Sequence, residues 1–293
     1  MLVRDGVEDD LRAMIALALE RCPHFEPWTI SGLFSGAVET DTVAVAHDED
    51  RLAGFGLSIH FRGSPDHQRS VLVMVDDRDA GAGLGHDLHE RCLASHPDSV
   101  TDVRTRVFDG DEVAMAVARH WGYESVQLSI TSRVELGIVP APAPPDGVTL
   151  EAIDELRVDD QEALDTLVAV SQTNPETANN HLLTPDEMRH WVFPDERPVI
   201  SLARVDGQPA AFCVGIVARE GDEGGVGFTG VDPRFRGRGL GRLVKEHVHH
   251  RAAGLGIRLL STDNEQHNHG IRRLNESLGY VPVFGVHRMR RTR

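Results

Sequence analysis

Arginine and glycine gather in one short segment in the second half of the chain. Its residues are Arg234, Arg236, Gly237, Arg238, Gly239, Gly241 and Arg242. The segment follows an apolar stretch that ends at Val231, and it precedes a helical pattern in which Leu240, Val244 and Val248 recur every four residues. A glycine loop between a strand and a helix directs several backbone N–H groups one way, and the helix N-terminus adds partial positive charge. Together with the arginines, this predicts a site for a ligand that carries several phosphate groups.

Two common phosphate-binding patterns do not fit this segment. The P-loop pattern G-x-x-x-x-G-K-S/T needs a glycine directly before a lysine, whereas Lys245, the only lysine, follows Val244. The dinucleotide pattern G-x-G-x-x-G would start at Gly239, and Val244 stands where its last glycine belongs. The pattern that remains is Arg236-x-x-Gly239-x-Gly241.

That pattern resembles the Arg/Gln-x-x-Gly-x-Gly/Ala motif of the GCN5-related N-acetyltransferase (GNAT) superfamily, which cradles the pyrophosphate of acetyl-CoA. Residues 229–241, 262–268 and 275–280 are similar to the family's signatures. The resemblance extends to both halves, as in tandem, mycothiol synthase-like acetyltransferases. It implies acetyl-CoA as cosubstrate and no metal. The cofactor contacts that it implies are Val231, Arg236, Gly237, Arg238, Gly239, Leu240, Gly241, Arg242, Asn264, Asn268 and Asn275.

The resemblance also implies how the reaction runs. A neutral primary amine attacks the thioester carbon directly, so no covalent enzyme intermediate is expected. The family positions the thioester where two strands splay beside a β-bulge, and Gly230 suits such a bulge. A backbone N–H near Val231 is expected to donate to the developing oxyanion.

The groups that move protons are less well defined. Many family members carry a tyrosine four residues before the Gly-aromatic pair, where it protonates the coenzyme A sulfur. Asn275 stands there in this chain, and Ala118 stands there in the first half. Asparagine is no acid, so we expect Asn275 to hold a water molecule or to hydrogen-bond the cofactor. The candidate general bases are Glu220, Asp222, Glu223 and Asp232, although a solvated loop carboxylate is the commoner interpretation of each.

Two classes of function stay open at this level. The first is transfer of an acetyl group from acetyl-CoA to the primary amine of a small molecule. The alternative is a non-catalytic protein that binds or senses coenzyme A, and a longer acyl group is a third option. The histidines between residues 247 and 269 lack the carboxylate or cysteine that would complete a zinc site. His181 and His190 are interpreted as surface residues.

An internal repeat indicates the elements that must position these residues. Segments 71–85 and 227–241 align at an offset of 156, and Trp121-Gly122-Tyr123 matches Leu278-Gly279-Tyr280 at an offset of 157. Such similar offsets indicate a tandem duplication. The predicted organisation is a degenerate GNAT-like domain over 1–136, a proline-rich linker over 137–147 and a catalytic GNAT domain over 148–293.

Each half is expected to be α/β, with a mixed, mostly antiparallel central sheet flanked by helices. Helices are predicted at 11–19, 84–92, 160–170 and 240–248, and a further one begins at Thr184. Strands are predicted at 42–46, 52–60, 103–107, 126–134, 148–152, 199–203, 209–217, 257–261 and 281–287. Residues 288–293 form a basic end, which is predicted either to be frayed or to contact acidic neighbours.

The length, composition and net charge of the chain limit which partners it can have. The chain has 293 residues, which suit two domains, and a formal net charge of −16. This acidity disfavours a nucleic-acid partner. There is no apolar run of membrane-spanning length and no signal-peptide layout, so we expect a cytoplasmic protein without a membrane partner, as a monomer or homodimer.

The acidity belongs mainly to the first half. Residues 1–146 contain 12 Arg against 25 Asp and Glu, a charge of −13, whereas residues 147–293 contain 18 Lys and Arg against 21 acids, a charge of −3. In the first half Ala80 replaces the motif arginine, and Asp76, Asp77 and Asp79 surround its loop. We therefore expect the first half to be a structural or acceptor-binding domain.

Overall fold

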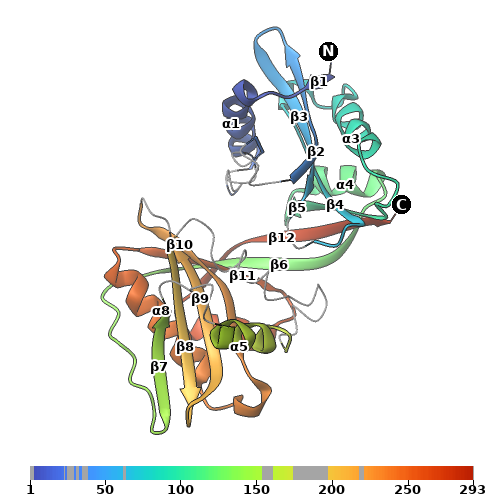
Figure 1. The fold of residues 1–293 in the computed structure, drawn as a ribbon. Coiled ribbons are helices and arrows are strands. Elements are labelled where there is room, and N and C mark those ends of the chain that lie inside the picture. Colours follow the sequence, from blue (N-terminus) through green and yellow to red (C-terminus); the bar gives the residue numbers. More distant parts are fainter. Residues whose placement is uncertain are drawn as a thin grey trace. The chain divides into compact units, whose positions relative to one another are not determined.

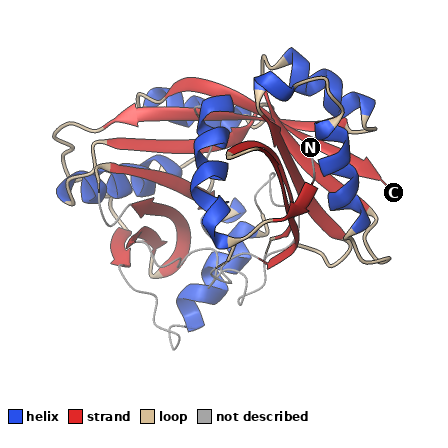
Figure 2. Ribbon diagram, turned by 90° about the horizontal axis from the view of Figure 1, so that it is seen from above, coloured by secondary structure: helices blue, strands red, loops and turns tan. Residues whose placement is uncertain are grey.

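The structure is a computed structural model of the chain. It describes residues 3–22, 24, 30, 33–34, 39–61, 64–153, 161–173, 197–217 and 221–292. The chain forms two compact units, Met1–Val126 with His287–Arg293, and Gln127–Val286. Each unit is a mixed sheet with helices packed on it, which confirms the predicted class (Figures 1 and 2). Within the described ranges, no helix combines the length and apolar character that crossing a membrane requires.

The first unit orders its strands as β1-β2-β3-β4-β5-β12. Neighbours among β1 to β4 are antiparallel, whereas β4 and β5 are parallel and are joined by a helical crossover. In chain order its elements are β1 (Val3–Asp5), α1 (Leu11–Arg21), β2 (Glu39–Asp48), β3 (Arg51–His60), β4 (Gln68–Val75), α3 (Leu84–Ala94), β5 (Asp102–Phe108), α4 (Glu112–His120) and β12 (Val281–Thr292).

The second unit repeats this plan with the order β6-β11-β10-β9-β8-β7. Here β10 and β11 form the parallel pair, and the other neighbours are antiparallel. Its elements are β6 (Glu124–Glu135), β7 (Val148–Ile153), α5 (Gln161–Ser171), β8 (Arg197–Val205), β9 (Gln208–Val217), β10 (Glu223–Val231), α8 (Leu240–Gly254), β11 (Leu259–Glu265) and α9 (His269–Ser277).

Strand β9 shows why the second unit has helices on both faces of its sheet. Successive side chains of a strand point to opposite faces, and β9 is apolar at both sets of positions. Ala211 and Cys213 share a buried cluster with Val244 of α8. Phe212 shares a different cluster with Val170 of α5. The continuous apolar run in the sequence is therefore typical of a central strand that has a helix packed on each face of its sheet.

The last strand of each half completes the sheet of the other half. Strand β6 pairs with β11 from Ser129↔Glu265 to Glu135↔Leu259. Strand β12 lies beside β5, and its Met289 is fully buried in the core of the first unit. Each compact unit therefore needs chain from both halves. The division into residues 1–136, 137–147 and 148–293 stays a prediction about the domains.

The C-terminal end is not frayed, and the alternative prediction, contact with acidic neighbours, is the one that the structure shows. Strand β12 continues to Thr292, and Arg290 Nε lies 3.2 Å from a carboxylate oxygen of the buried Asp102. Met289 is buried between the half-buried Arg288 and the exposed Arg290, and the strand partner that fixes this pattern lies far away in the sequence. The local composition of residues 288–293 is therefore, by itself, typical of an unstructured tail.

The other predicted elements in the described ranges are present, with shifted ends. The helix predicted over 240–248 continues to Gly254, and the strand predicted over 257–261 spans Leu259–Glu265. The helix predicted to begin at Thr184, together with His181 and His190, lies outside the described residues.

Shortening Met289 tests the strand exchange. Met289→Ala removes a fully buried side chain from the core of the first unit, and we expect the free energy of unfolding to fall by about 2 to 5 kcal/mol. Val283→Ala on the same strand is the control, since Val283 is 41% exposed and should change stability by less than about 0.5 kcal/mol. Chemical denaturation with amide exchange locates the loss. Faster exchange in β10 and β11, with β3 to β5 unchanged, would contradict the assignment.

Candidate functional site

Strands β10 and β11 pair only at their beginning and then separate. Their last paired residues are Gly225 and Ser261. Directly after this point, the register of β10 against β9 shifts between Val226 and Phe228, which marks a β-bulge at Gly227. A bulge bends its strand and disrupts the ladder, so β10 leaves β11 here. The strands enclose a cleft of about 60 Å³, lined by residues 226–229 of β10, 262–264 of β11, and Asn268 and Ile271 at the start of α9.

Gly230 does not form this bulge, which corrects the expectation from the sequence. Gly230 pairs in register with Phe212 of β9. A Cβ added to it would lie 2.6 Å from a ring carbon of Phe228 and 2.9 Å from a methyl group of Val170. Close packing therefore requires this glycine. The sequence Val226-Gly-Phe-Thr-Gly230 holds two glycines, and only the pairing with β9 decides which one is bulged.

The register also fixes the direction of the N–H groups at the end of β10. Asp232 donates its N–H to Ala210 O at 2.8 Å. Hydrogen-bonded and non-hydrogen-bonded pairs alternate in an antiparallel ladder, so the N–H and C=O of Val231 point away from β9. Arg236 Nε donates to Val231 O on that side at 3.1 Å. Since β11 has already separated, the Val231 N–H faces the side of β10 on which the cleft opens.

The glycine loop that follows leaves main-chain donors unused. Gly237 and Gly239 both have a φ of 77°, and a Cβ on either would meet nothing within 4 Å. Helix α8 begins at Leu240, and Leu243 N–H is bonded to Gly239 O at 3.1 Å. The earlier N–H groups of the first turn have no acceptor within the helix. Open space in front of such donors fits an anion.

The loop arginines contribute less free charge than their number indicates. Two of them form ion pairs at 2.8 Å, Arg234 with Asp232 and Arg242 with Glu246. Arg238 lies 5.5 Å from the centre of the Phe235 ring. Among the described residues, no acceptor takes its guanidinium. Arg238 is therefore the loop arginine best placed to bind a further anionic group of a ligand whose first anionic group lies at the N–H donors of the loop.

Arg236, the first residue of the motif, has a positioning role in this structure. Its Nε donates to Val231 O and one terminal nitrogen donates to Thr173 O at 2.8 Å. Thr173 lies in the turn that follows α5. The side chain thus ties the end of β10 and the loop to the end of a neighbouring helix, and it holds the backbone donors in place.

The three asparagines expected at the cofactor come together at the cleft. Asn264 and Asn268 line it, and Asn275 Nδ2 donates to Asn264 Oδ1 at 2.6 Å. Asn268 also caps α9, because its Oδ1 accepts from Ile271 N at 3.4 Å. Asn275 is 3% exposed, so it reaches the cleft through Asn264.

The candidate bases are not gathered at the loop. Glu220 lies outside the described residues. Asp222 and Glu223 stand at the beginning of β10, roughly 30 Å along the strand from its end. The Asp222 main-chain oxygen accepts from Arg258 and its side chain is more than half exposed. Hydrogen bonds from Arg234 lower the pKa of Asp232, so this carboxylate is a weak proton acceptor.

The histidines of α8 have local partners. The pairs are His247 with the Ser201 hydroxyl, His249 with the Tyr280 hydroxyl and His250 with Val139 O. In the part of the chain that the structure describes, no three His, Cys, Asp or Glu side chains are grouped so that they could hold a metal ion.

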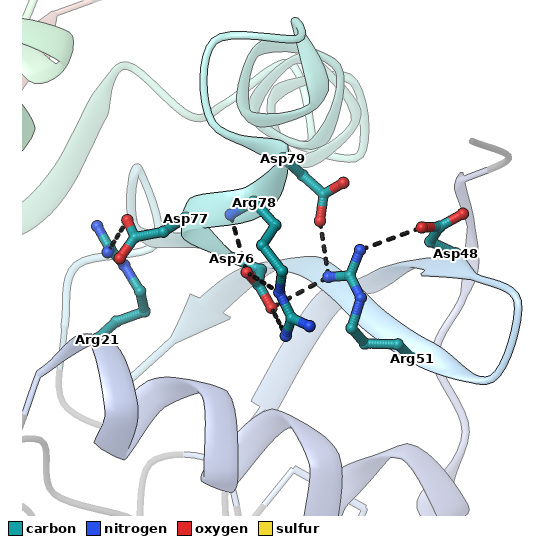
Figure 3. Close-up of polar contacts among 7 residues, drawn as sticks. All are labelled: Arg21, Asp48, Arg51, Asp76, Asp77, Arg78 and Asp79. Carbon is teal, nitrogen blue, oxygen red and sulfur yellow. Dashed lines mark hydrogen bonds and ion pairs between the residues drawn. The ribbon is translucent and has the colours of Figure 1, made fainter.

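In the equivalent loop of the first unit, the carboxylates form ion pairs with nearby arginines (Figure 3). Arg51 binds Asp76 at 3.0 Å and Asp79 at 2.7 Å, and Arg78 binds Asp76 at 2.6 Å. Hydrogen bonds from Arg78 lower the pKa of Asp76, which keeps it anionic. Strand β4 runs beside β3 without a register shift. This copy therefore combines a carboxylate-rich loop with an unbulged strand.

Comparison with known proteins agrees with this geometry. Residues 163–280 match the acetyltransferase (GNAT) family model. The mycothiol acetyltransferase of Nocardioides sp. (strain ATCC BAA-499 / JS614) is 27% identical over 256 residues, which cover 82% of this chain and 77% of that protein. A solved tandem GNAT protein from the clavulanic acid biosynthesis pathway shares 18% identity and a TM-score of 0.77, over 99% of this chain and 98% of that one. Residues 163–280 thus match a GNAT domain, and the chain as a whole has the fold of tandem GNAT proteins.

A second solved structure supports the same fold over both halves. The GCN5-related N-acetyltransferase from Sphaerobacter thermophilus has a TM-score of 0.74 at 19% identity, over 99% of this chain and 95% of that one. The family model covers mainly the half that holds the bulge, the cleft and the glycine loop. The match of residues 163–280 to the GNAT family supports acyl transfer as the general chemistry.

Lys245 is a further residue of this site, and the motifs in the sequence did not indicate it. Its side chain is fully buried, its Nζ donates to Asn275 Oδ1 at 2.6 Å, and it lies 4.6 Å from the centre of the Tyr280 ring. The sequence does hold a signal, because positions 245 and 252 are two helical turns apart and Ala252 lies on the buried face of α8. A lysine there is at odds with the amphipathic pattern.

Replacing Lys245 should stabilise the protein in a pH-dependent way. Burial lowers the pKa of the Lys245 ammonium from 10.5 to about 8. Between these values the unfolded state binds more protons than the native state, so the free energy of unfolding of the wild type rises with pH. Lys245→Met lacks this rise. We expect its advantage to be largest below pH 8 and to shrink by about 3 kcal/mol toward pH 10.5.

Denaturation of both proteins across this pH range measures the difference. The comparison is clean because Lys245 is the only lysine. An advantage for Lys245→Met that grows above pH 8 would contradict the burial of a charged ammonium.

Proposed function

We propose that this chain transfers an acetyl group from acetyl-CoA to the primary amine of a small molecule. The observation that carries the proposal is the cleft beside the Gly227 bulge, which adjoins a glycine loop with unused N–H donors. A strand opening of this kind accepts an extended thioester arm, and the helix N-terminus accepts its phosphates. The match of residues 163–280 to the GNAT family supports the same chemistry.

In this proposal the cofactor contacts divide into two groups. The N–H groups of residues 237–241 and the Arg238 guanidinium take the pyrophosphate, while Arg236 and Arg242 hold the loop through their protein partners. Asn264 and Asn268 face the arm in the cleft. The residues present use only hydrogen bonds and charge, so the proposal includes no metal.

Direct attack of the amine on the thioester carbon forms the C–N bond and breaks the C–S bond. The Val231 N–H, which faces away from β9, donates to the oxygen that becomes negative. Asn275 has no acidic proton, so its contribution lies in the hydrogen bonds that it makes. Glu220 stays a proposed proton acceptor for the amine, whereas Asp222 stands roughly 30 Å along β10 from Val231 and is no longer proposed.

The first unit is proposed to have a structural or acceptor-binding role. Its loop carboxylates Asp76 and Asp79 form ion pairs with Arg51. Carboxylates at this loop disfavour the binding of phosphate. We also propose that the protein acts in the cytoplasm, as a monomer or homodimer, on an acceptor that is neither nucleic acid nor membrane.

A thiol-release assay tests the activity. The full chain is mixed with acetyl-CoA and a panel of primary amines, and free thiol and acetylated amine are both quantified. We expect turnover on at least one amine in the panel. Saturable binding of acetyl-CoA in calorimetry without turnover on any amine would instead support a coenzyme A-binding or sensing protein.

A matched pair of glycine variants tests where the phosphates bind. Gly83 and Gly239 are equivalent residues that precede a helix with a positive φ and open space at the Cβ position. Alanine at either should cost about 1 kcal/mol of stability, because it strains the backbone. We expect only Gly239→Ala to weaken acetyl-CoA binding, by about tenfold or more, in calorimetry on the full chain. Equal losses in both variants would place phosphate binding in both units.

A further inference from the structure

We propose that Lys245 is a positioning residue of the acyl-transfer site, whose ammonium fixes the polarity of the Asn275 and Asn264 amides so that Asn264 directs an N–H group at the coenzyme A sulfur in the cleft. The inference rests on the proposed function. It names a group that stabilises the departing thiolate, where many family members carry a tyrosine and this chain carries Asn275.

The three side chains form one continuous line from the core to the cleft. Lys245 Nζ lies 2.6 Å from Asn275 Oδ1, and Asn275 Nδ2 lies 2.6 Å from Asn264 Oδ1. Lys245 is fully buried, Asn275 is 3% exposed, and Asn264 is half-buried in the cleft wall. The line therefore begins where water is excluded and ends where a substrate enters.

The charge at the buried end sets the direction of every hydrogen bond along this line. An ammonium only donates, so Asn275 must turn its oxygen toward Lys245 and its NH2 group toward Asn264. Asn264 must in turn present its oxygen to Asn275. The NH2 group of Asn264 is then free to donate, and among the described residues no acceptor forms a hydrogen bond with it. The cleft is thus supplied with an N–H donor whose orientation cannot be reversed while Lys245 is charged.

The surroundings of Lys245 indicate that it does not stabilise the fold. The titratable groups that face it are Cys213 on β9, His249 on α8 and Tyr280 after α9. Burial raises the pKa of the Cys213 thiol and the Tyr280 phenol, and it lowers the pKa of His249 to about 4, so all three are neutral at pH 7. In the described structure no carboxylate pairs with the ammonium. An apolar side chain would pack there at lower cost.

The repeat provides an internal comparison. The first-unit equivalent of Lys245 is His89, for which burial lowers the pKa to about 4, and the equivalent of Asn275 is Ala118. Both elements of the line are missing from the copy whose β4 has no bulge. The buried charge and the cleft therefore occur in the same unit.

The proposed step balances without a further reactant. The amine nitrogen forms a bond to the carbonyl carbon, the C–S bond breaks, and its electron pair stays on sulfur. The Asn264 N–H donates a hydrogen bond to that thiolate and keeps its proton. The proton that the thiol finally gains equals the one that the attacking amine loses. Hydrogen bonds to a charged acceptor are stronger than those to a neutral one, so the line acts mainly on the thiolate.

The test measures the thiol of bound coenzyme A, so it does not depend on knowing the acceptor. Full-length wild type, Lys245→Met, Asn264→Leu and the double variant are each saturated with coenzyme A, and thiolate absorbance is followed against pH relative to ligand-free protein. We expect either single change to raise the midpoint of the bound thiol by about one pH unit, a tenfold loss of thiolate stabilisation. The double variant should lose no more than the single ones, because both act through one donor.

Controls separate this role from a structural one. His89→Met makes the same replacement at the equivalent position of the first unit and should leave the midpoint unchanged. Lys245→Met should unfold at a higher temperature than wild type while its acyl transfer falls about tenfold. An unchanged midpoint in Lys245→Met, or additive losses in the double variant, would overturn the proposal even when coenzyme A binds. Failure of the wild type to bind coenzyme A would overturn the proposed function as well.

Discussion

The separation of β10 from β11 after Gly225 is the constraint on which the site depends. One unpaired residue, Gly227, bends β10 and ends the parallel ladder. The cleft exists because two strands that share a sheet stop sharing hydrogen bonds. The same event leaves the Val231 N–H without a strand partner and lets Arg236 reach the Val231 carbonyl. Cleft, oxyanion donor and loop position are thus consequences of one irregularity.

A second constraint is the buried charge of Lys245. Taking an ammonium out of water costs free energy, and here one amide oxygen and one aromatic face are the compensation. A fold selected for stability alone would place a methionine or leucine at this position of α8. The site therefore carries local instability that the surrounding core, with Val244 and Val248 fully buried, has to offset.

The two copies share one backbone plan but differ in the strand that precedes the glycine loop and in the charges of that loop. Asp76 N–H bonds to Ala53 O at 2.9 Å in the first unit, just as Asp232 N–H bonds to Ala210 O at 2.8 Å in the second. The backbone plan is therefore shared at this point. What differs is a bulge and the charge of a few loop side chains. Meanwhile the exchange of β6 and β12 makes each core depend on the other half of the chain.

The class of the fold, the repeat and the loop 236–241 are predictable from the sequence, because they depend on short-range periodicity and on glycines that the local backbone requires. Three features emerge only from the folded chain: the bulge at Gly227, the strand at residues 288–292 and the contact of Lys245 with Asn275. Each of these depends on a partner many residues away: β9 for the bulge, β5 for the last strand and α9 for the lysine. No local pattern encodes such a pairing, since register and burial are properties of two segments together.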